Sequence, residues 1–162
     1  MTNDDFVTGV EYPEPFHAYA LALCETASRY IYIMSPELDH RAFDHDDLVT
    51  ALSAVARSSR QTEVRILISD SRKIVANGHR LLQLARRLPS TVHLQKLAQH
   101  PDWNGETIVI RDRNGVLYKP GGSDHQGFYE PDSRSSTIRH IELFEELWRY
   151  SIKDTELRTL HL

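Results

Sequence analysis

The sequence lacks the usual marks of a secreted or membrane-bound protein. Its 162 residues include one cysteine, Cys24, so no internal disulfide can form and nothing indicates an oxidising compartment. No apolar run approaches the roughly 18 residues that a membrane-spanning helix needs. The acidic opening MTNDDFVTGVEYPEP has no basic and apolar signal segment. We therefore expect a cytoplasmic protein that makes no membrane contact.

Basic charge and established enzyme motifs are also scarce. The net charge of −4 and the pI near 6.1 exclude a surface that is basic throughout, although a local basic patch remains possible. The sequence contains no Walker-type loop, no G-x-G-x-x-G and no G-x-S-x-G elbow. We expect no cofactor, and any anion site must be local.

What the sequence does contain is an alternation of helical and extended patterns. A flexible leader at 1–14 is expected, because Pro13 and Pro15 interrupt any helix there. Helical periodicity and β-branched runs then alternate. The expected helices are 16–30, 44–59, 78–88 and 136–151, and the expected strands are 30–36, 64–69 and 91–97. This order predicts an α/β fold, with 15–162 as a single domain and a mixed, mainly parallel sheet covered by helices on both faces.

The stretch ETIVIRDRNGVLYKPGGSD, residues 106–124, predicts a β-hairpin. A β-branched run from Thr107 to Ile110 is followed by Asn114-Gly115, the dipeptide that favours a tight type I′ turn. Asp112 would lie near the tip of this hairpin. The residue is either part of a catalytic site or part of the scaffold.

Positive charge is concentrated after the second expected strand. From Asp70 to Arg87, five basic residues stand against one acidic residue, so this segment carries +4 and the remainder −8. Ligands of open α/β sheets bind beyond the carboxyl ends of the strands, and the start of a helix favours anions. Asp70, Arg72, His79 and Arg80 are therefore candidate anion-binding residues, although His79 could equally be structural.

The loop LDHRAFDHDD, residues 38–47, offers carboxylate and imidazole ligands. A divalent metal could bind there. However, Asp46 and Asp47 are already explained as residues of a helix start, and polar loops are usually solvated. We therefore expect no metal site.

With this architecture, Tyr30 to Ser151 resembles one half of the phospholipase D-like superfamily, in which a hairpin carries H-x-K-x-x-x-x-D followed by G-S-x-N. Taking Asp112 as the motif aspartate puts Gly105 in place of the histidine and Thr107 in place of the lysine. Gly122-Ser123 resembles the G-S pair but falls three residues late and precedes Asp124-His125. The family histidine forms a phosphoenzyme intermediate, so its loss implies a degenerate, inactive member. Asp112 and Ser123 would then be remnants of the motif.

A closer resemblance is to an uncharacterised bacterial domain of this superfamily that often follows an acetyltransferase-like domain. The likeness rests on residues 64–88, on 136–151 and on the ending DTELRTLHL. It implies that Asp70, Arg72, His79 and Arg139 line the old active-site cleft, and that an acetyltransferase-like domain is a possible partner. As an alternative, Arg139 is a surface arginine on a helix.

Three functional hypotheses follow. The first is a catalytically inactive phospholipase D-like domain that binds a phosphate-containing ligand, a nucleic acid or another anion as a binding or regulatory module. The second is a phosphodiesterase or nuclease in which His79 replaces the missing nucleophile and Asp70 orients it. The third is a purely structural dimerisation domain. Superfamily members with one motif per chain pair two halves around a shared cleft, so we expect a homodimer.

Overall fold

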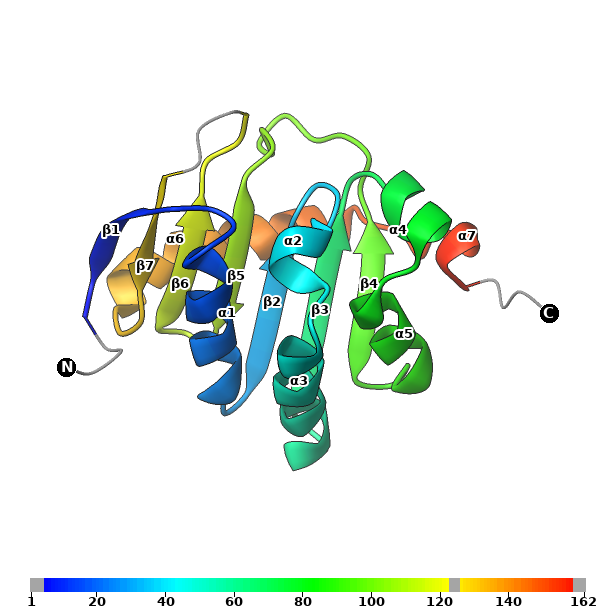
Figure 1. The fold of residues 1–162 in the computed structure, drawn as a ribbon, viewed down its shortest axis with the longest axis horizontal. Coiled ribbons are helices and arrows are strands. Elements are labelled where there is room, and N and C mark those ends of the chain that lie inside the picture. The colour runs from blue at the N-terminus through cyan, green and yellow to red at the C-terminus, as the bar shows by residue number, and fades with distance from the viewer. Residues whose placement is uncertain (1–4, 123–125, 159–162) are drawn as a thin grey trace.

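The computed structural model describes residues 5–122 and 126–158, which form a seven-stranded sheet between layers of helices (Figure 1). The strands are β1 (Val7–Val10), β2 (Tyr30–Met34), β3 (Glu63–Ile68), β4 (Val92–Lys96), β5 (Thr107–Arg111), β6 (Gly115–Lys119) and β7 (Gly127–Glu130). The helices are α1 (Phe16–Glu25), α2 (His40–Phe43), α3 (Asp46–Ser58), α4 (Arg72–Asn77), α5 (Arg80–Arg87), α6 (Arg134–Arg149) and α7 (Thr155–Arg158). The predicted α/β class and mixed sheet are confirmed.

The strand order is β1-β7-β6-β5-β2-β3-β4. Only the pairs β2–β3 and β3–β4 are parallel, whereas the other four pairs are antiparallel. Parallel pairing is thus less extensive than the sequence predicts. The reason is local, because the hairpin and the short connection after it cannot hold the helical crossover that parallel strands require.

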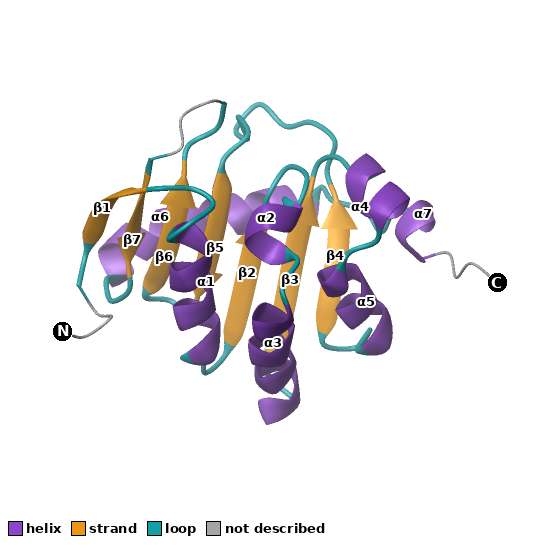
Figure 2. Ribbon diagram, viewed as in Figure 1, coloured by secondary structure: helices purple, strands orange, loops and turns teal. Residues whose placement is uncertain are grey.

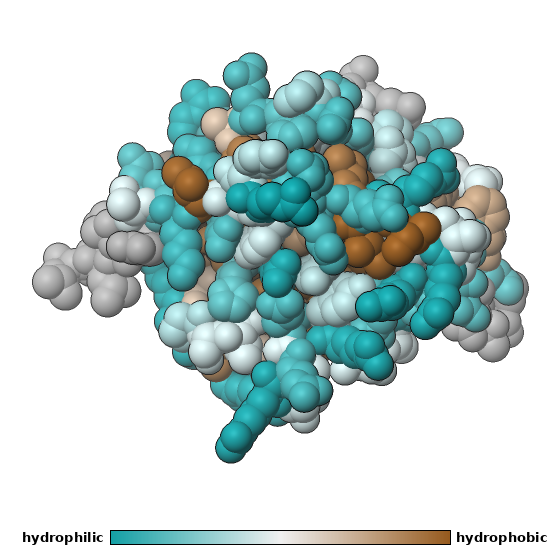
Figure 3. Space-filling view, turned by 180° about the vertical axis from the view of Figure 1, so that it is seen from behind, coloured by the Kyte–Doolittle hydropathy of each residue, from teal (hydrophilic) through white to brown (hydrophobic). Residues whose placement is uncertain are grey.

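Helices cover both faces of the sheet, as expected. α1, α2, α3 and α5 lie on one face, and α6 crosses the other (Figure 2). Successive residues of β2 alternate between the two cores: Ile31 and Ile33 pack under the first set of helices, while Tyr32 and Met34 pack against α6. On the α6 side the molecular surface is largely hydrophilic, with separate apolar patches (Figure 3). On α6, Ile138 is 43% exposed, whereas Ile141 and Phe144 are buried.

The expected leader contains a strand. Residues Val7–Val10 form β1, which pairs with β7, and Val10 is buried. The prolines at 13 and 15 exclude a helix but not a strand that precedes them. Gly9 has φ +65° where the pairing register shifts, so a bulge lets this short, irregular strand pair with β7. The expectation of a leader at 1–14 is therefore wrong for these residues.

The hairpin forms, but its turn is not the expected one. Arg111 pairs with Gly115, so the loop has three residues, Asp112–Asn114, rather than the two of a type I′ turn. The left-handed residue is Asp112, with φ +50°. Aspartate tolerates this conformation because its short polar side chain can form local hydrogen bonds.

The edge strand β4 is partly covered by the chain that follows α6. Lys96 and Ile152 exchange two backbone hydrogen bonds in an antiparallel bridge, with N–O distances of 2.8 and 2.9 Å. Beyond it, Leu157 of α7 is buried in the first core. Within residues 5–122 and 126–158, no helix has the length and apolar character needed to cross a membrane.

Candidate functional site

The candidate site lies at one rim of the sheet, which we call the carboxyl rim. It consists of the carboxyl ends of β2, β3 and β4, the start of β5 and the end of β6, all at the top of Figure 1. The antiparallel pairing of Met34 with Ile108 brings the start of β5 to this rim. The motif positions before β5 and the basic segment after β3 therefore lie at the same end of the molecule.

At the rim, the positions of the motif histidine and lysine are occupied by Gly105 and Thr107, so neither an imidazole nor an ammonium group is present there. Thr107 is buried and pairs with Lys119 across the hairpin. Gly105 has φ +87°, a conformation that side-chain-bearing residues rarely adopt. A Cβ at Gly105 would lie 3.5 Å from the Cα of Gly121, in the loop after β6. The backbone at the histidine position is thus shaped for glycine.

Asp112 lies at the opposite end of the sheet. Its Oδ1 accepts hydrogen bonds from the backbone N–H groups of Arg29 and Tyr30 at 2.7 and 3.1 Å, and its Oδ2 accepts one from Ser28 at 3.0 Å. These amides precede or begin β2, so the carboxylate ties the hairpin tip to the start of the neighbouring strand. The geometry is that of a scaffold. Ser123, the other remnant position, lies outside the described residues.

Asp70 and Arg72 lie together at the rim, just after β3. The Asp70 carboxylate accepts hydrogen bonds from Nε of Arg72 at 3.0 Å and from Nη2 at 2.6 Å. Bonding to Arg72 lowers the pKa of Asp70 to about 2. The arginine side chain is nevertheless 88% exposed. The Nη1 atom of Arg72 makes no hydrogen bond within the described part of the chain, so the Nη1 side of the guanidinium faces solvent.

His79 has a different environment, because its ring is fully buried. Nε2 donates to the Leu38 carbonyl at 3.0 Å, and Nδ1 accepts from the N–H of Leu81 at 3.0 Å, so the residue caps the start of α5. Burial lowers the pKa of His79 to about 4, even though Asp44 opposes the shift. Both ring nitrogens are occupied within the protein, and neither is available to a substrate.

Arg80 is paired with acidic groups, and Arg139 lies elsewhere. Arg80 donates to Asp46 from Nε at 2.9 Å and has Nη1 3.2 Å from Asp44, while its backbone N–H donates to Asp44 at 2.8 Å. Arg139 belongs to α6, on the other face of the sheet. The structure therefore brings Asp70, Arg72, His79 and Arg80 to the rim region and leaves Arg139 apart from them.

The basic segment at 70–87 has acidic partners that are not recognised from the sequence. Glu37 pairs with Lys73 at 2.9 Å, and Asp44 and Asp46 pair with Arg80. A signal was present, because residues 37–47 contain five acidic residues and one arginine. The two oppositely charged segments follow adjacent parallel strands, so they must meet at one rim.

A separate group of arginines surrounds the hairpin tip. Arg29, Arg113 and Arg134 line a hollow with Asp112 and Asp132. None of the three arginines forms an ion pair with another side chain among residues 5–122 and 126–158. This hollow is the alternative place for an anion, at the opposite end from the carboxyl rim.

Comparisons with known proteins identify a family from the sequence and similar folds among solved structures. The model of a family described as a domain of unknown function (DUF7931) matches residues 12–160. No curated protein matches the chain in sequence. Similar solved structures include Nuc, a phospholipase D family member from Salmonella typhimurium, with a TM-score of 0.63 and 16% identity over 93% of this chain and 99% of Nuc. NucT from Helicobacter pylori has a TM-score of 0.62 and 12% identity over 93% of this chain and 100% of NucT.

A third similar structure is that of a DNA-binding protein. TrmBL2, described as an archaeal chromatin protein with a novel mode of DNA binding, has a TM-score of 0.64 and 14% identity over 93% of this chain. The present chain spans only about half of that protein, 54% of its length. At these identities the likenesses establish a phospholipase D-like fold and nothing finer.

Proposed function

The chain belongs to the family of a domain of unknown function (DUF7931), and from that premise we propose that it is a catalytically inactive phospholipase D-like domain that binds a phosphate-containing or other anionic ligand at the carboxyl rim. The observation that carries this proposal is the rim itself. Its two motif positions hold glycine and threonine instead of histidine and lysine, and the exposed guanidinium of Arg72 lies at the same rim.

The inactivity follows from the chemistry of the lost groups. A phosphoenzyme mechanism needs a nucleophile, and Gly105 supplies none. Thr107 carries no charge with which to stabilise a phosphoryl oxygen. Restoring one side chain would not be enough, because the positive φ of Gly105 is unfavourable for histidine. His79 does not replace the nucleophile, since its nitrogens bond to Leu38 and Leu81.

The anion-binding part of the proposal rests on the orientation of Arg72. Asp70 bonds to the Nε and Nη2 atoms of the guanidinium and thereby fixes its plane. The Nη1 side then faces solvent, where a phosphate oxygen can accept a charge-assisted hydrogen bond. Lys96 lies close enough to help lower the pKa of Asp70, so it adds positive potential near Arg72. Its Nζ is also 3.4 Å from Oδ2 of Asp154.

The test of binding compares two exposed arginines at opposite ends of the molecule. AMP and a short single-stranded oligonucleotide are titrated against wild type, Arg72→Ala and Arg113→Ala, with backbone amide shifts followed by NMR. We expect shifts around Arg72 and His79, and an affinity at least about fivefold weaker in Arg72→Ala alone, as for a lost charge-assisted bond of about 1 kcal/mol or more. Equal affinities in all three proteins, or no shifts at millimolar ligand, would remove the proposal. A loss in Arg113→Ala instead would place the anion at the hairpin tip.

The test of inactivity uses bis(p-nitrophenyl) phosphate and single-stranded DNA as substrates. We expect wild type to hydrolyse neither above the rate of a buffer blank. The control is His79→Asn, which retains a capping side chain at the start of α5. A wild-type rate that falls in this variant, with the variant still folded by circular dichroism, would show that His79 catalyses and that the domain is an enzyme.

A further inference from the structure

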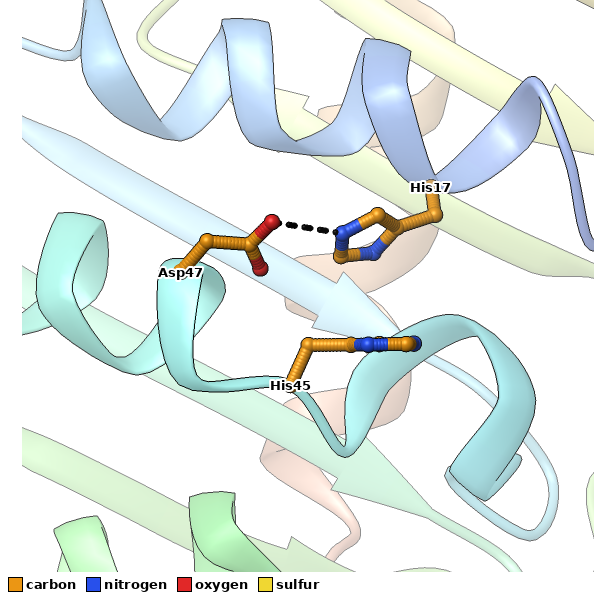
Figure 4. A group of neighbouring side chains, drawn as sticks. All are labelled: His17, His45 and Asp47. Carbon is orange, nitrogen blue, oxygen red and sulfur yellow. Dashed lines mark hydrogen bonds and ion pairs between the residues drawn. The ribbon is translucent and has the colours of Figure 1, made fainter.

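A second group of polar side chains lies between α1 and the start of α3 (Figure 4). His17 comes from the first turn of α1, His45 directly precedes α3, and Asp47 lies in its first turn. One nitrogen or oxygen from each residue lies within 4.8 Å of those of the other two. His17 is buried, whereas the Asp47 side chain is 50% exposed, so solvent reaches the group from one side.

Backbone carbonyls fix the tautomers of both histidines. Nδ1 of His17 is 2.8 Å from the carbonyl oxygen of Ala42, and Nε2 of His45 is 2.7 Å from that of Arg41. Because a carbonyl oxygen can only accept, each of these nitrogens carries the proton. The lone pairs that remain are on Nε2 of His17 and Nδ1 of His45. Metal-binding histidines commonly donate their second N–H to a backbone carbonyl in this way.

The contact between His17 and Asp47 fits two states. Nε2 of His17 is 3.1 Å from Oδ2 of Asp47. If Nε2 were protonated as well, the pair would be an imidazolium bonded to a carboxylate. A tetrahedral ion with bonds of about 2.0 Å instead holds its ligand atoms roughly 3.3 Å apart, so the same spacing suits two ligands of one metal.

We propose that His17, His45 and Asp47 bind a divalent transition metal of the zinc type. Two imidazole nitrogens and one carboxylate oxygen are ligands that zinc prefers, whereas magnesium and calcium prefer oxygen alone. Water fills the fourth position from the open side next to Asp47. The bound ion would join α1 to α3, two helices that pack against each other on one face of the sheet. In the sequence, His45 and Asp47 fall in the loop at 38–47, where a metal site is not expected because Asp46 and Asp47 belong to a helix start. The third ligand, His17, precedes that loop by more than twenty residues and reaches it only in the fold.

The test measures zinc binding by calorimetry and cobalt binding by visible absorption. Wild type is compared with His45→Ala and Asp47→Asn, which remove one ligand each at partly exposed positions. The matched control is Asp46→Asn, a neighbouring carboxylate that pairs with Arg80 and lies outside the group. We expect one ion per chain and intense absorption from four-coordinate cobalt in wild type and Asp46→Asn. Both ligand variants should bind at least about tenfold more weakly, since even outer partners of a metal contribute about 10–100-fold.

A second readout separates this site from adventitious binding by other histidines. Zinc should raise the melting temperature of wild type and Asp46→Asn, because it binds only the folded arrangement of α1 and α3. Neither ligand variant should gain this stability. Equal zinc affinity in wild type and both ligand variants, or no bound ion in wild type, would overturn the proposal and leave His17 and Asp47 as an ion pair.

Discussion

His79 shows how one buried side chain can make stability depend on pH. Burial lowers its pKa from 6.5 to about 4, so between these values the unfolded chain binds more protons than the folded one. The free energy of unfolding should therefore rise with pH across this window. The stabilisation lost on acidification is up to about 3 kcal/mol. Urea unfolding at a series of pH values measures it.

The variant His79→Asn isolates the contribution of His79 to this pH dependence. Asparagine can accept the hydrogen bond from Leu81 but does not titrate. The free energy of unfolding of the variant should therefore be about 1–2 kcal/mol lower at pH 7 and should depend less on pH below 6.5. Comparing this variant with wild type is needed because the pKa of His17 is shifted in the opposite direction and so gives the opposite pH dependence of stability. Burial alone would lower the pKa of His17, but the Ala42 carbonyl and Asp47 outweigh burial and raise it. An unchanged pH profile in His79→Asn would contradict the assignment.

Asp112 is a second residue whose role can be measured directly. Asp112→Asn keeps an oxygen for Arg29 and Tyr30 and loses mainly the bond from Ser28, so it should cost about 1 kcal/mol. Asp112→Ala loses all three bonds and places alanine at φ +50°, so it should cost about 2–3 kcal/mol. Denaturant unfolding gives both values. The anion affinity and the pKa of His79 should stay the same, and a lower His79 pKa in Asp112→Asn would show instead that the hairpin belongs to a working site.

At the scale of elements, the loops before β5 and after β6 approach each other through glycine. A Cβ on Gly121 would lie 2.0 Å from the carbonyl oxygen of Asn104, whereas a Cβ on Gly122 would meet nothing within 4 Å. We therefore expect Gly121→Ala to destabilise the protein by more than about 2 kcal/mol, because backbone must move. Gly122→Ala should cost only about 1 kcal/mol, from its positive φ. Similar melting temperatures for the two variants would contradict this packing.

Periodicity predicts the longer elements well and the short ones poorly. The helices at 46–58 and 134–149 follow from the spacing of their buried leucines, isoleucines and phenylalanines. β1 and β7 are missed because each has four residues and contains glycine, which weakens a strand pattern. The turn at Asp112 is missed because its partners are amides near residue 28, far away in sequence.

The candidate sites show the same limit. The sequence places Asp70, Arg72, His79 and Arg80 in one basic segment, in which the first two residues follow the end of a strand and the last two begin the next helix. It cannot predict that His79 is a buried cap, because this depends on the Leu38 carbonyl in another loop. The histidine–aspartate group is incomplete in the sequence for a similar reason. His45 and Asp47 lie together at the start of α3, but His17 comes from α1 and reaches them only through the packing of the two helices.

For the whole molecule, the resemblance to phospholipase D-like proteins with one motif per chain predicts a homodimer. Light scattering at tens of micromolar should give twice the chain mass of 18.7 kDa. Repeating the measurement after dilution separates a weak dimer from a stable one. A monomer mass at the higher concentration would contradict the expectation. A dimer that binds neither AMP nor oligonucleotide would favour the structural dimerisation hypothesis over the anion-binding one.

The bridge between Lys96 and Ile152 has a consequence for solubility. An uncovered strand edge offers free N–H and C=O groups to which another chain can add a strand, and this is how many aggregates begin. The bridge occupies the end of β4 near the carboxyl rim, and the buried Leu157 anchors the chain that makes it. Detachment of that segment, by proteolysis or by a charged residue at Leu157, would expose the edge of β4 to pairing with another chain. The segment from Ile152 to Leu157 therefore protects the protein against aggregation through its own sheet.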